Sequence, residues 1–500
     1  MYMKIRLECA SITEIKCDVL IVNEFEGVKH PGGATGAIDK ALDGEISKLL
    51  ASGEITGKLG STNVVHTMCK IPADEVICVG LGKANEFNYD KVRIVSDAAI
   101  KATKRTHAKR VATIIHGAGI GGLDPKLAAQ AVVEGSLIGD YKFKGFKSEK
   151  DDENSNLQEL VLVDYDPKKI KEIEPNVEMA QIIIEATNKA RDIVNSPSNK
   201  VTPTFLADYA KELAKDMKLE FQALSREDIK KKGMDALYNV SKGSDEEPKM
   251  IVLKYSGGGK ETYGLIGKGI TFDSGGISIK PSSKLSEMKT DMAGAAAVIE
   301  VMRVIAKLKL PLNVIAVIPA TENMPGGHAY KPGDVIGSLS GKTIEIITTD
   351  AEGRLILADA ITYAKELGAT KLVDIATLTG GVRVALGDAA SGIMGNDQHL
   401  IDALIESSKA TGEKLWQLPL FEEYKEYLKS DIADIMNATE SGGKASTSVG
   451  GVFLQKFAGD TPWAHIDIGA TAYLEKGFGY LSSGATGYGV RLLVNFLQNM

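Results

Sequence analysis

The chain of 500 residues contains little cysteine, and all of it lies near one end. The four cysteines, Cys9, Cys17, Cys69 and Cys78, fall within the first 80 residues, and no two of them form a C-x-x-C pair. A disulfide framework needs several regularly spaced cysteines, and a thiolate zinc site usually needs such pairs. The sequence therefore disfavours both kinds of site, and we expect buried, reduced thiols.

Long apolar runs are also missing. No segment approaches the roughly 18 apolar residues that a membrane-spanning helix requires. The first six residues, MYMKIR, lead into a strand-like segment and not into the apolar core of a signal peptide. We therefore expect a cytoplasmic protein that has no membrane partner.

Positive charge is in deficit, since 59 lysines and arginines face 66 aspartates and glutamates, for a net charge of -7 and a pI near 5.7. Such a surface repels nucleic acid phosphates unless a local basic patch overrides the net charge. Nucleic acid is therefore not an expected partner.

Several catalytic motifs are absent as well. The sequence has no G-x-S-x-G elbow and no H-E-x-x-H helix, which disfavours a serine hydrolase of that type and a zinc protease of that type. The segment Gly341 to Thr343 resembles the end of a phosphate loop, but Ile336 stands where that motif needs its first glycine. A phosphate-loop NTPase is therefore disfavoured too.

The length exceeds what one hydrophobic core supports, because cores stop growing near roughly 250–300 residues. Two domains are expected. In the first 165 residues, short β-branched runs alternate with helical patterns, which predicts a mostly parallel sheet covered by helices. The expected strands are 18–23, 75–79, 111–116 and 160–164, and the expected helices are 36–51, 90–107 and 125–139. The polar stretch 142–156 is expected to be an exposed loop.

A long helical pattern from about Glu178 to Ile193 follows, and the domain boundary is placed near residue 170. Beyond it, strand and helix alternate again, with expected strands at 264–269, 314–319, 344–348 and 371–375 and expected helices at 292–306 and 357–367. We therefore predict a two-domain α/β fold. An N-terminal α/β domain with a mostly parallel sheet (1–170), assigned to assembly or regulation, precedes a larger C-terminal α/β catalytic domain with a central mixed sheet (171–500).

Two windows of the C-terminal part concentrate acidic residues and glycines. They run from Gly267 to Asp291 (GKGITFDSGGISIKPSSKLSEMKTD) and from Thr348 to Leu355 (TTDAEGRL), where an α/β sheet would have the carboxyl ends of its strands. Asp350 and Glu352 are two residues apart, so on an extended backbone both would project to one face and could chelate one ion or bridge two. Asp273 precedes a glycine pair, which lets the chain turn sharply beside it.

Each aspartate also has a structural explanation. An aspartate before a glycine pair often belongs to a turn, and Asp291 precedes the apolar segment MAGAAA, where an N-cap aspartate is expected. The charge count favours a metal site. Asp273, Asp291, Asp350 and Glu352 carry four negative charges, enough for two divalent cations, and none of the seven histidines lies in either window. Carboxylates without imidazole suit Mg, Mn or Zn, so the ligands alone do not select the metal.

Two lysines, Lys268 and Lys280, lie in the first window. A lysine beside two metal ions would have its pKa lowered and could bind a metal as a neutral amine. Two metals would share a water as the nucleophile and polarise a scissile carbonyl group.

The segments GKGITFDSGGISIK (267–280) and TDAEGRL (349–355) resemble the two signatures of the leucyl aminopeptidase family, whose members are also called cytosol aminopeptidases. Further similar segments are ARDIVN (190–195), LKSDIADIMN (428–437) and WAHID (463–467). The resemblance is strong over about residues 180–500, and rests on size and α/β character alone in the first 165.

The resemblance implies a two-metal aminopeptidase, a hydrolase that releases N-terminal amino acids from peptides by metal-activated water attack, preferring leucine and other large apolar residues. It implies that one metal is held by Lys268, Asp273, Asp291 and Glu352, and the other by Asp273, Asp350 and Glu352. The expected ions are manganese or zinc, with magnesium or cobalt as alternatives. A homohexamer is implied as well.

The remaining roles come from the same resemblance. Lys280 would polarise the substrate carbonyl, and Arg354 would hold a bicarbonate ion that serves as general base, which suits a forked guanidinium. Asp291 and one metal would bind the free α-amine of the substrate. Met288 would form an apolar wall of the side-chain pocket, although core packing is the structural alternative for it.

Two positions depart from the family pattern: Thr348 stands where asparagine is usual, and Gly469-Ala470 reverses the usual order. We expect metal binding to survive both, and any effect of these two departures to fall on the side-chain preference. A rival hypothesis is a dipeptidase or Cys-Gly hydrolase on the same site. A second rival is a DNA-binding role, known for some bacterial relatives, against which the acidic charge argues.

Overall fold

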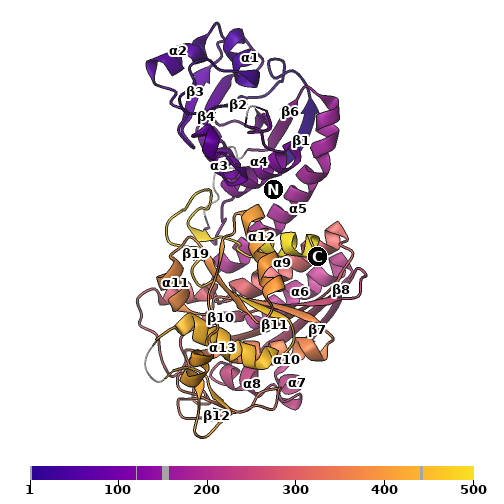
Figure 1. Ribbon diagram of the computed structural model, residues 1–500, viewed down its shortest axis with the longest axis vertical. Helices are drawn as coiled ribbons and strands as arrows, with labels where there is room; N and C mark the ends of the chain where they lie inside the picture. Colours follow the sequence, from indigo (N-terminus) through magenta and orange to yellow (C-terminus); the bar gives the residue numbers. More distant parts are fainter. Residues whose placement is uncertain (1–2, 120, 149–156, 440–442) are drawn as a thin grey trace. The chain divides into compact units, whose positions relative to one another are not determined.

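The computed structural model describes residues 3–119, 121–148, 157–439 and 443–500 (Figure 1). They form two compact units: unit 1 comprises residues 1–185 and 477–482, and unit 2 comprises residues 186–476 and 483–500. The boundary expected near residue 170 lies close to the start of helix α5 (Pro167–Asn195). Among the described residues, no helix is both long and apolar enough to cross a membrane.

Unit 1 is built on a six-stranded sheet in the order β1-β6-β5-β2-β4-β3. Its strands are β1 (Lys4–Cys9), β2 (Val19–Glu24), β3 (Thr62–His66), β4 (Glu75–Gly80), β5 (Arg110–Thr113) and β6 (Glu159–Asp164). All neighbouring strands are parallel except β3 and β4. The prediction of a mostly parallel sheet in the N-terminal domain is confirmed.

The helices of unit 1 are α1 (Gly33–Ala41), α2 (Glu45–Ser52), α3 (Tyr89–Thr103) and α4 (Pro125–Asp140), with a short 3-10 helix η1 (Ala84–Glu86). The single helix expected over 36–51 is wrong. Asp43 and Gly44 adopt left-handed backbone conformations, with φ of 58° and 79°, and so divide it into α1 and α2. The expected loop 142–156 is irregular as far as residue 148, and the rest of it lies outside the described residues.

Helix α5 begins earlier than its apolar pattern indicated. Pro167 occupies its first turn, where a missing N–H costs nothing. The side chain of Asp166 accepts a hydrogen bond from the backbone N–H of Lys168 (2.9 Å). These two residues start the helix about ten residues before the predicted Glu178.

The four cysteines are free thiols. Cys17 and Cys78 are buried, but Cys9 and Cys69 are exposed, so the expectation of buried thiols holds for only half of them. Burial raises the pKa of both Cys17 and Cys78 to about 12, which keeps these two thiols protonated and unreactive.

Unit 2 is built on a nine-stranded sheet in the order β16-β15-β18-β14-β9-β11-β8-β7, with β10 also paired to β11. Its strands are β7 (Glu220–Leu224), β8 (Lys249–Ser256), β9 (Thr262–Gly267), β10 (Gly269–Asp273), β11 (Asn313–Asn323), β14 (Lys371–Ala376), β15 (Ser391–Gly395), β16 (Leu415–Gln417) and β18 (Trp463–Asp467). Strands β9, β10, β11, β14 and β18 run parallel, whereas β7, β8 and β15 introduce antiparallel pairs. The predicted central mixed sheet is confirmed.

Helices cover both faces of this sheet (Figure 1). On one face, α10 (Glu352–Glu366) packs against α8 (Asp235–Ser241) and α13 (Ser446–Ala458) and buries apolar residues of β9, β11 and β14. On the other, α9 (Ala293–Leu308) packs against α6 (Pro203–Met217) and α14 (Val490–Gln498). The remaining elements are α7 (Arg226–Lys231), α11 (Gly380–Leu386), α12 (Gln398–Thr411), η3 (Leu285–Thr290), η4 (Glu422–Leu428), β12 (Val335–Ile336), β13 (Ile344–Glu345), β17 (Ile435–Met436), β19 (Tyr473–Leu474) and β20 (Gly484–Ala485).

Two predicted elements near the second acidic window differ from the structure. The strand expected over 344–348 ends after Glu345, because the N–H of Ile347 donates to the side chain of Asn437 (2.8 Å) instead of to a neighbouring strand. The helix expected over 357–367 already begins at Glu352. The second acidic window therefore crosses from a loop into the first turn of α10.

Candidate metal centre

The predicted site residues lie at the carboxyl ends of the central strands of unit 2. Strand β11 pairs with β9 along its first half and with β10 along its second half, and Lys268 lies at the break between β9 and β10. Asp273 ends β10, and Asp291 follows η3. Asp350 and Glu352 lie at the start of α10. The fold thus gathers four segments at one edge of the sheet, as the doubly wound pattern predicts.

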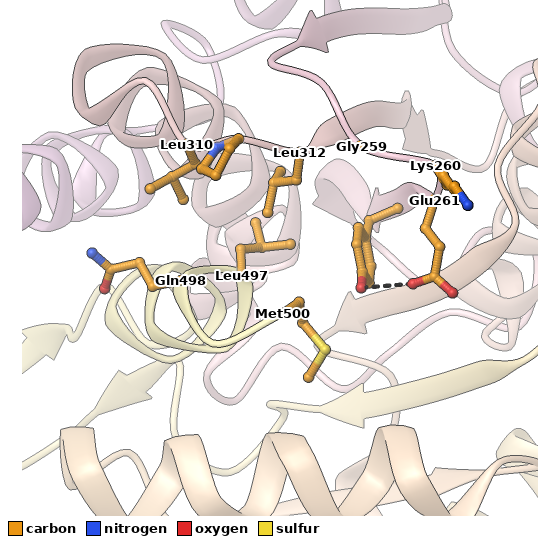
Figure 2. Close-up of a pocket in the computed structure, with 10 residues that line it drawn as sticks. Gly259, Lys260, Glu261, Leu310, Leu312, Leu497, Gln498 and Met500 are labelled. Carbon is orange, nitrogen blue, oxygen red and sulfur yellow. Dashed lines mark hydrogen bonds between the residues drawn. The ribbon is translucent and has the colours of Figure 1, made fainter.

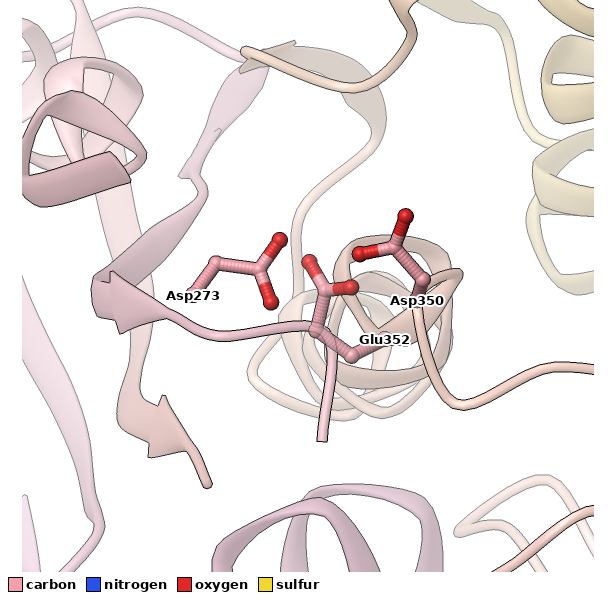
Figure 3. Close-up of side chains that lie close together, drawn as sticks. All are labelled: Asp273, Asp350 and Glu352. Carbon is pink, nitrogen blue, oxygen red and sulfur yellow. The ribbon is translucent and has the colours of Figure 1, made fainter. Parts of the chain in front are cut away.

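Three carboxylates point toward one another at this edge (Figure 3). Oxygen atoms of Asp273, Asp350 and Glu352 lie within 4.8 Å of one another. Asp273 and Glu352 are buried, and Asp350 is partly open to solvent, with 37% of its side chain exposed. Three like charges at this spacing repel one another in a poorly solvated site, so they need cations beside them.

The backbone that brings Asp350 and Glu352 together is not the extended one that was predicted. Glu352 is the first residue of α10, and Ala351 before it has φ of -120° and ψ of 40°. The two carboxylates converge because the chain turns into a helix between them. The expectation that they share a face of a strand is therefore wrong, although their proximity is correct.

Lys268 lies among these acidic groups and is almost completely buried. Its Nζ lies 2.8 Å from Asp291 Oδ1, 3.0 Å from Glu352 Oε1 and 2.9 Å from the carbonyl oxygen of Thr377. Burial opposes the charge on Lys268, but the nearby carboxylates outweigh it and raise its pKa. A neutral Lys268 amine would therefore require additional positive charge beside the same carboxylates.

Lys280 bridges the other side of the cluster. Its Nζ lies 2.9 Å from Asp273 Oδ2 and 2.5 Å from Asp350 Oδ1. Burial again opposes the charge, and the carboxylates again raise its pKa overall. With 22% of its side chain exposed, Lys280 is accessible from solvent, unlike Lys268.

Asp291 is not the helix cap that its sequence context allowed. Met292 is the N-cap residue of α9, and no side chain caps that helix. Asp291 Oδ1 instead accepts hydrogen bonds from Lys268 and from the Thr377 hydroxyl (2.7 Å), while Asp291 Oδ2 is buried without a hydrogen-bond partner. Burial raises the pKa of Asp291 even though Lys268 lies beside it, so the positive charge nearby does not fully offset the burial of this carboxylate.

The donor set fits divalent cations. Four carboxylates, those of Asp273, Asp291, Asp350 and Glu352, face two lysine ammonium groups, which leaves two negative charges uncompensated. Burial also raises the pKa of Asp350, to about 6. Oxygen ligands with surplus negative charge and an unpartnered buried oxygen suit hard or borderline divalent ions.

Arg354 lies in the first turn of α10, two residues beyond Glu352, and is buried. Its Nη1 donates to the carbonyl oxygen of Asn437 (2.8 Å), and its Nε is buried without a partner. Burial lowers the pKa of Arg354 to about 10, although Glu352 and Asp467 partly restore it. No ion pair of Arg354 is found within the described part of the chain, so a surface ion pair does not account for it.

Met288 belongs to η3 and is half-buried, three residues before Asp291. The hydroxyl of Thr348, at the first position that departs from the family pattern, accepts a hydrogen bond from the backbone N–H of Asp350 (3.2 Å). At the second departure, a side chain at Gly469 would meet the carbonyl oxygen of Thr379 at 2.6 Å. With this backbone, a residue other than glycine at position 469 would therefore require the chain near Thr379 to shift.

Sequence reasoning missed two polar residues of this region, Asn323 and Thr377. Asn323 ends β11 and donates to Asp273 Oδ1 (2.8 Å), and Thr377 follows β14 and donates to Asp291. Thr377 lies two residues after the predicted strand 371–375, and Asn323 lies four residues after the predicted strand 314–319. This placement was the available signal, since strand ends meet at the same edge of the sheet.

A separate pocket of about 240 Å³ lies at the opposite edge of the sheet (Figure 2). It is lined by residues 259–261, 263, 310–312, 497, 498 and 500. The segments 259–261 and 310–312 precede β9 and β11, so the pocket adjoins the amino ends of these strands. It contains none of the predicted site residues.

Comparison with known proteins identifies the family of this chain. Residues 188–494 match the profile of the "Cytosol aminopeptidase family, catalytic domain", and residues 21–150 match that of the "Cytosol aminopeptidase family, N-terminal domain". A "Probable cytosol aminopeptidase" of Geobacter sulfurreducens is 44% identical over 498 residues, covering 99% of each chain. Another, of Alkaliphilus oremlandii, is 42% identical over 500 residues and covers both chains completely.

Solved structures show the same fold. The "Bottromycin maturation enzyme BotP" superimposes with a TM-score of 0.85 and 32% identity, covering 96% of this chain and 99% of its own. The same enzyme "in complex with Mn" gives a TM-score of 0.85 and 33% identity, with the same coverage.

Proposed function

Because the chain belongs to the cytosol aminopeptidase family, whose members are metal-dependent aminopeptidases, we propose that it uses two metal ions to remove leucine and other large apolar residues from peptide N-termini. The observation that carries this proposal is the cluster of Asp273, Asp350 and Glu352, with Lys268 and Lys280 on either side.

In this proposal, Lys268, Asp273, Asp291 and Glu352 hold one ion, and Asp273, Asp350 and Glu352 hold the other. Manganese or zinc is proposed, with magnesium or cobalt as alternatives, and a related enzyme is described in complex with manganese. When bound, two such ions supply Lewis acidity toward a carbonyl group and lower the pKa of water. The four carboxylates carry as much negative charge as two divalent cations carry positive charge. A second ion therefore requires that Lys268 bind as a neutral amine, because with both lysines charged one divalent cation would already neutralise the cluster.

The chain's own residues then position the substrate. Asp291 would accept the free α-amine, and this requirement for an amine makes the enzyme an exopeptidase. The Lys280 ammonium, which solvent reaches, would donate to the substrate carbonyl oxygen as negative charge develops there. Arg354 would hold a bicarbonate ion as general base. Its Nε is buried without a hydrogen-bond partner, which supports an anion as its acceptor. Half-buried Met288 would form an apolar wall for the N-terminal side chain.

The assignment of domains belongs to the same proposal. We propose residues 171–500 as the catalytic domain, since all four carboxylates and both lysines lie there, and residues 1–170 as a domain for assembly or regulation. The family resemblance is also the basis for proposing a homohexamer that acts in the cytoplasm.

A substrate series tests the proposed activity. Purified protein loaded with Mn²⁺ or Zn²⁺ is assayed with the p-nitroanilides of leucine, methionine, alanine and aspartate, and with N-acetyl-leucine p-nitroanilide as a blocked control. We expect leucine and methionine to give the highest kcat/KM and the acetylated substrate to give no cleavage. Cleavage of the blocked substrate would contradict the role of the free amine. Equal rates for aspartate and leucine would contradict the apolar preference.

A further inference from the structure

Asn323 lies directly beside Asp273, because the two residues end the neighbouring parallel strands β11 and β10 and are partners in the sheet register. Asn323 is completely buried. Its side-chain Nδ2 donates to Asp273 Oδ1 (2.8 Å) and to the carbonyl oxygen of Thr349 (3.0 Å). One amide group therefore connects the two acidic windows, which lie far apart in the sequence.

The two carboxylate oxygens of Asp273 have different partners. Oδ1 accepts from Asn323 Nδ2 and from the backbone N–H of Gly275 (2.9 Å). Oδ2 lies 2.9 Å from Lys280 Nζ, on the side of the acidic cluster. Asn323 thus helps to hold Asp273 Oδ1 in hydrogen bonds within the protein, while Oδ2 is directed toward the proposed cations.

The second bond of Asn323 fixes the segment that precedes Asp350. The carbonyl oxygen of Thr349 accepts from both Asn323 and the Tyr330 hydroxyl (2.9 Å). The Thr349 hydroxyl in turn donates to the carbonyl oxygen of Gly275 (2.6 Å) and accepts from the N–H of Ser278 (2.8 Å). Thr349 is therefore held from several sides, and Asn323 ties its position to that of Asp273.

A purely structural role does not explain why the residue is an asparagine. Its Oδ1 is buried without a hydrogen-bond partner and faces Gly276, where an added Cβ would lie only 2.8 Å from it. A buried polar atom without a partner lowers stability. The donor hydrogens of Asn323, and not its oxygen, are the part of the side chain that the site uses.

We infer that Asn323 is a positioning residue for metal binding: its amide orients the Asp273 carboxylate and sets the spacing between Asp273 and Asp350. This inference rests on the proposed function, in which Asp273 is shared by both ions. Residues that orient metal ligands typically contribute a factor of about 10–100 to metal affinity. We therefore expect loss of the Asn323 amide to weaken binding of both ions.

The test measures metal affinity directly, without an activity assay. Wild-type protein and the variants Asn323→Ala and Asn323→Leu are stripped with a chelator, and Mn²⁺ and Zn²⁺ binding is measured by competition with a fluorescent metal indicator. Leucine has the same number and branching of side-chain heavy atoms as asparagine but no donors, and alanine removes both, so the two variants separate shape from hydrogen bonding. Asn313→Ala is the matched control, since Asn313 begins the same strand and, within the described part of the chain, its side chain hydrogen-bonds only to the backbone of Gly258 and Gly259.

We expect both Asn323 variants to bind metal about 10–100-fold more weakly than wild type, and Asn313→Ala to bind it normally. Asp273→Ala serves as the reference for a lost ligand. If Asp273→Ala loses metal while both Asn323 variants keep wild-type affinity, the inference is wrong and the proposed function stands. If Asp273→Ala also keeps wild-type affinity, the proposed metal site itself is wrong. If neither Asn323 variant folds, Asn323 serves the fold and the inference is overturned.

Discussion

Replacing Gly353 by alanine should disturb the proposed metal site through a single added methyl group. Gly353 is the second residue of α10 and lies against the side chain of Lys268. A Cβ at this position would meet Lys268 Cε at 2.5 Å and Nζ at 2.6 Å, whereas ordinary van der Waals contact begins at 3.4 Å. The lysine would have to move by about 0.9 Å, the difference between 3.4 and 2.5 Å.

Lys268 has little freedom to make that movement. Its Nζ is held by Asp291, Glu352 and the carbonyl oxygen of Thr377 at 2.8 to 3.0 Å, and its side chain is 3% exposed. Overpacking a buried site typically costs about 1–3 kcal/mol. The roughly 0.5–1 kcal/mol that alanine gains over glycine in a helix stabilises the metal-free and the metal-bound protein alike, so it does not change metal affinity. If this strain of about 1–3 kcal/mol makes the free energy of metal binding less favourable, the affinity for metal is roughly 5–150-fold weaker.

The assay compares metal affinity and turnover of leucine p-nitroanilide for wild type, Gly353→Ala and Gly327→Ala. Gly327 is an exposed glycine of the same unit, and a Cβ there would have no heavy atom within 4 Å, so that variant should resemble wild type. We expect Gly353→Ala to fold and to bind metal more weakly. Wild-type metal affinity and turnover in Gly353→Ala would refute the argument that Lys268 is held firmly in the site.

Three further predictions address other parts of the molecule. Lys280→Ala should keep both metals but lose roughly 10²–10³-fold in kcat, the usual effect of removing one donor to developing negative charge; metal loss with unchanged kcat would contradict this role. Arg354→Ala should keep its metals and its KM and lose about 10²–10⁴-fold in kcat, and added bicarbonate should activate bicarbonate-depleted wild type but not the variant. In unit 1, burial lowers the pKa of His116 to about 4, so the stability that its neutral form contributes is fully present above pH 6.5 and is lost as the pH falls toward 4. This loss amounts to about 3 kcal/mol, and urea unfolding between pH 4 and 7 should show a shallower pH dependence in His116→Gln than in wild type or in the exposed control His66→Gln.

Much of the fold could be predicted because buried parallel strands appear as apolar runs. Strands β2, β4 and β6 were recognisable in this way, and their ends agree with the structure to within two residues. The edge strands β3 (TNVVH) and β7 (EFQAL) carry exposed, polar residues on one face and were not recognised. Strand order depends on pairing between distant segments, which no local pattern contains.

The site residues that could be predicted from the sequence are charged and lie close together along the chain, within two windows. The acidic residues of the two windows could be identified because their charges call for cations, whereas Asn323 carries no charge and is the last residue of a mostly apolar strand. Its role became visible only when the sheet register placed it beside Asp273. The extended-backbone argument for Asp350 and Glu352 failed for a related reason, since the start of α10 depends on packing as well as on local sequence.

The most direct test of the two-metal site is the metal content of the active protein. Stripped protein is titrated with Mn²⁺ or Zn²⁺ while bound metal, by elemental analysis, and turnover of leucine p-nitroanilide are followed together. The proposed site predicts two ions per chain in wild type, with full turnover only when both are bound, and marked loss of both ions in Asp273→Ala and Glu352→Ala. Full turnover at one ion per chain, or stoichiometric metal and full turnover in either variant, would contradict it.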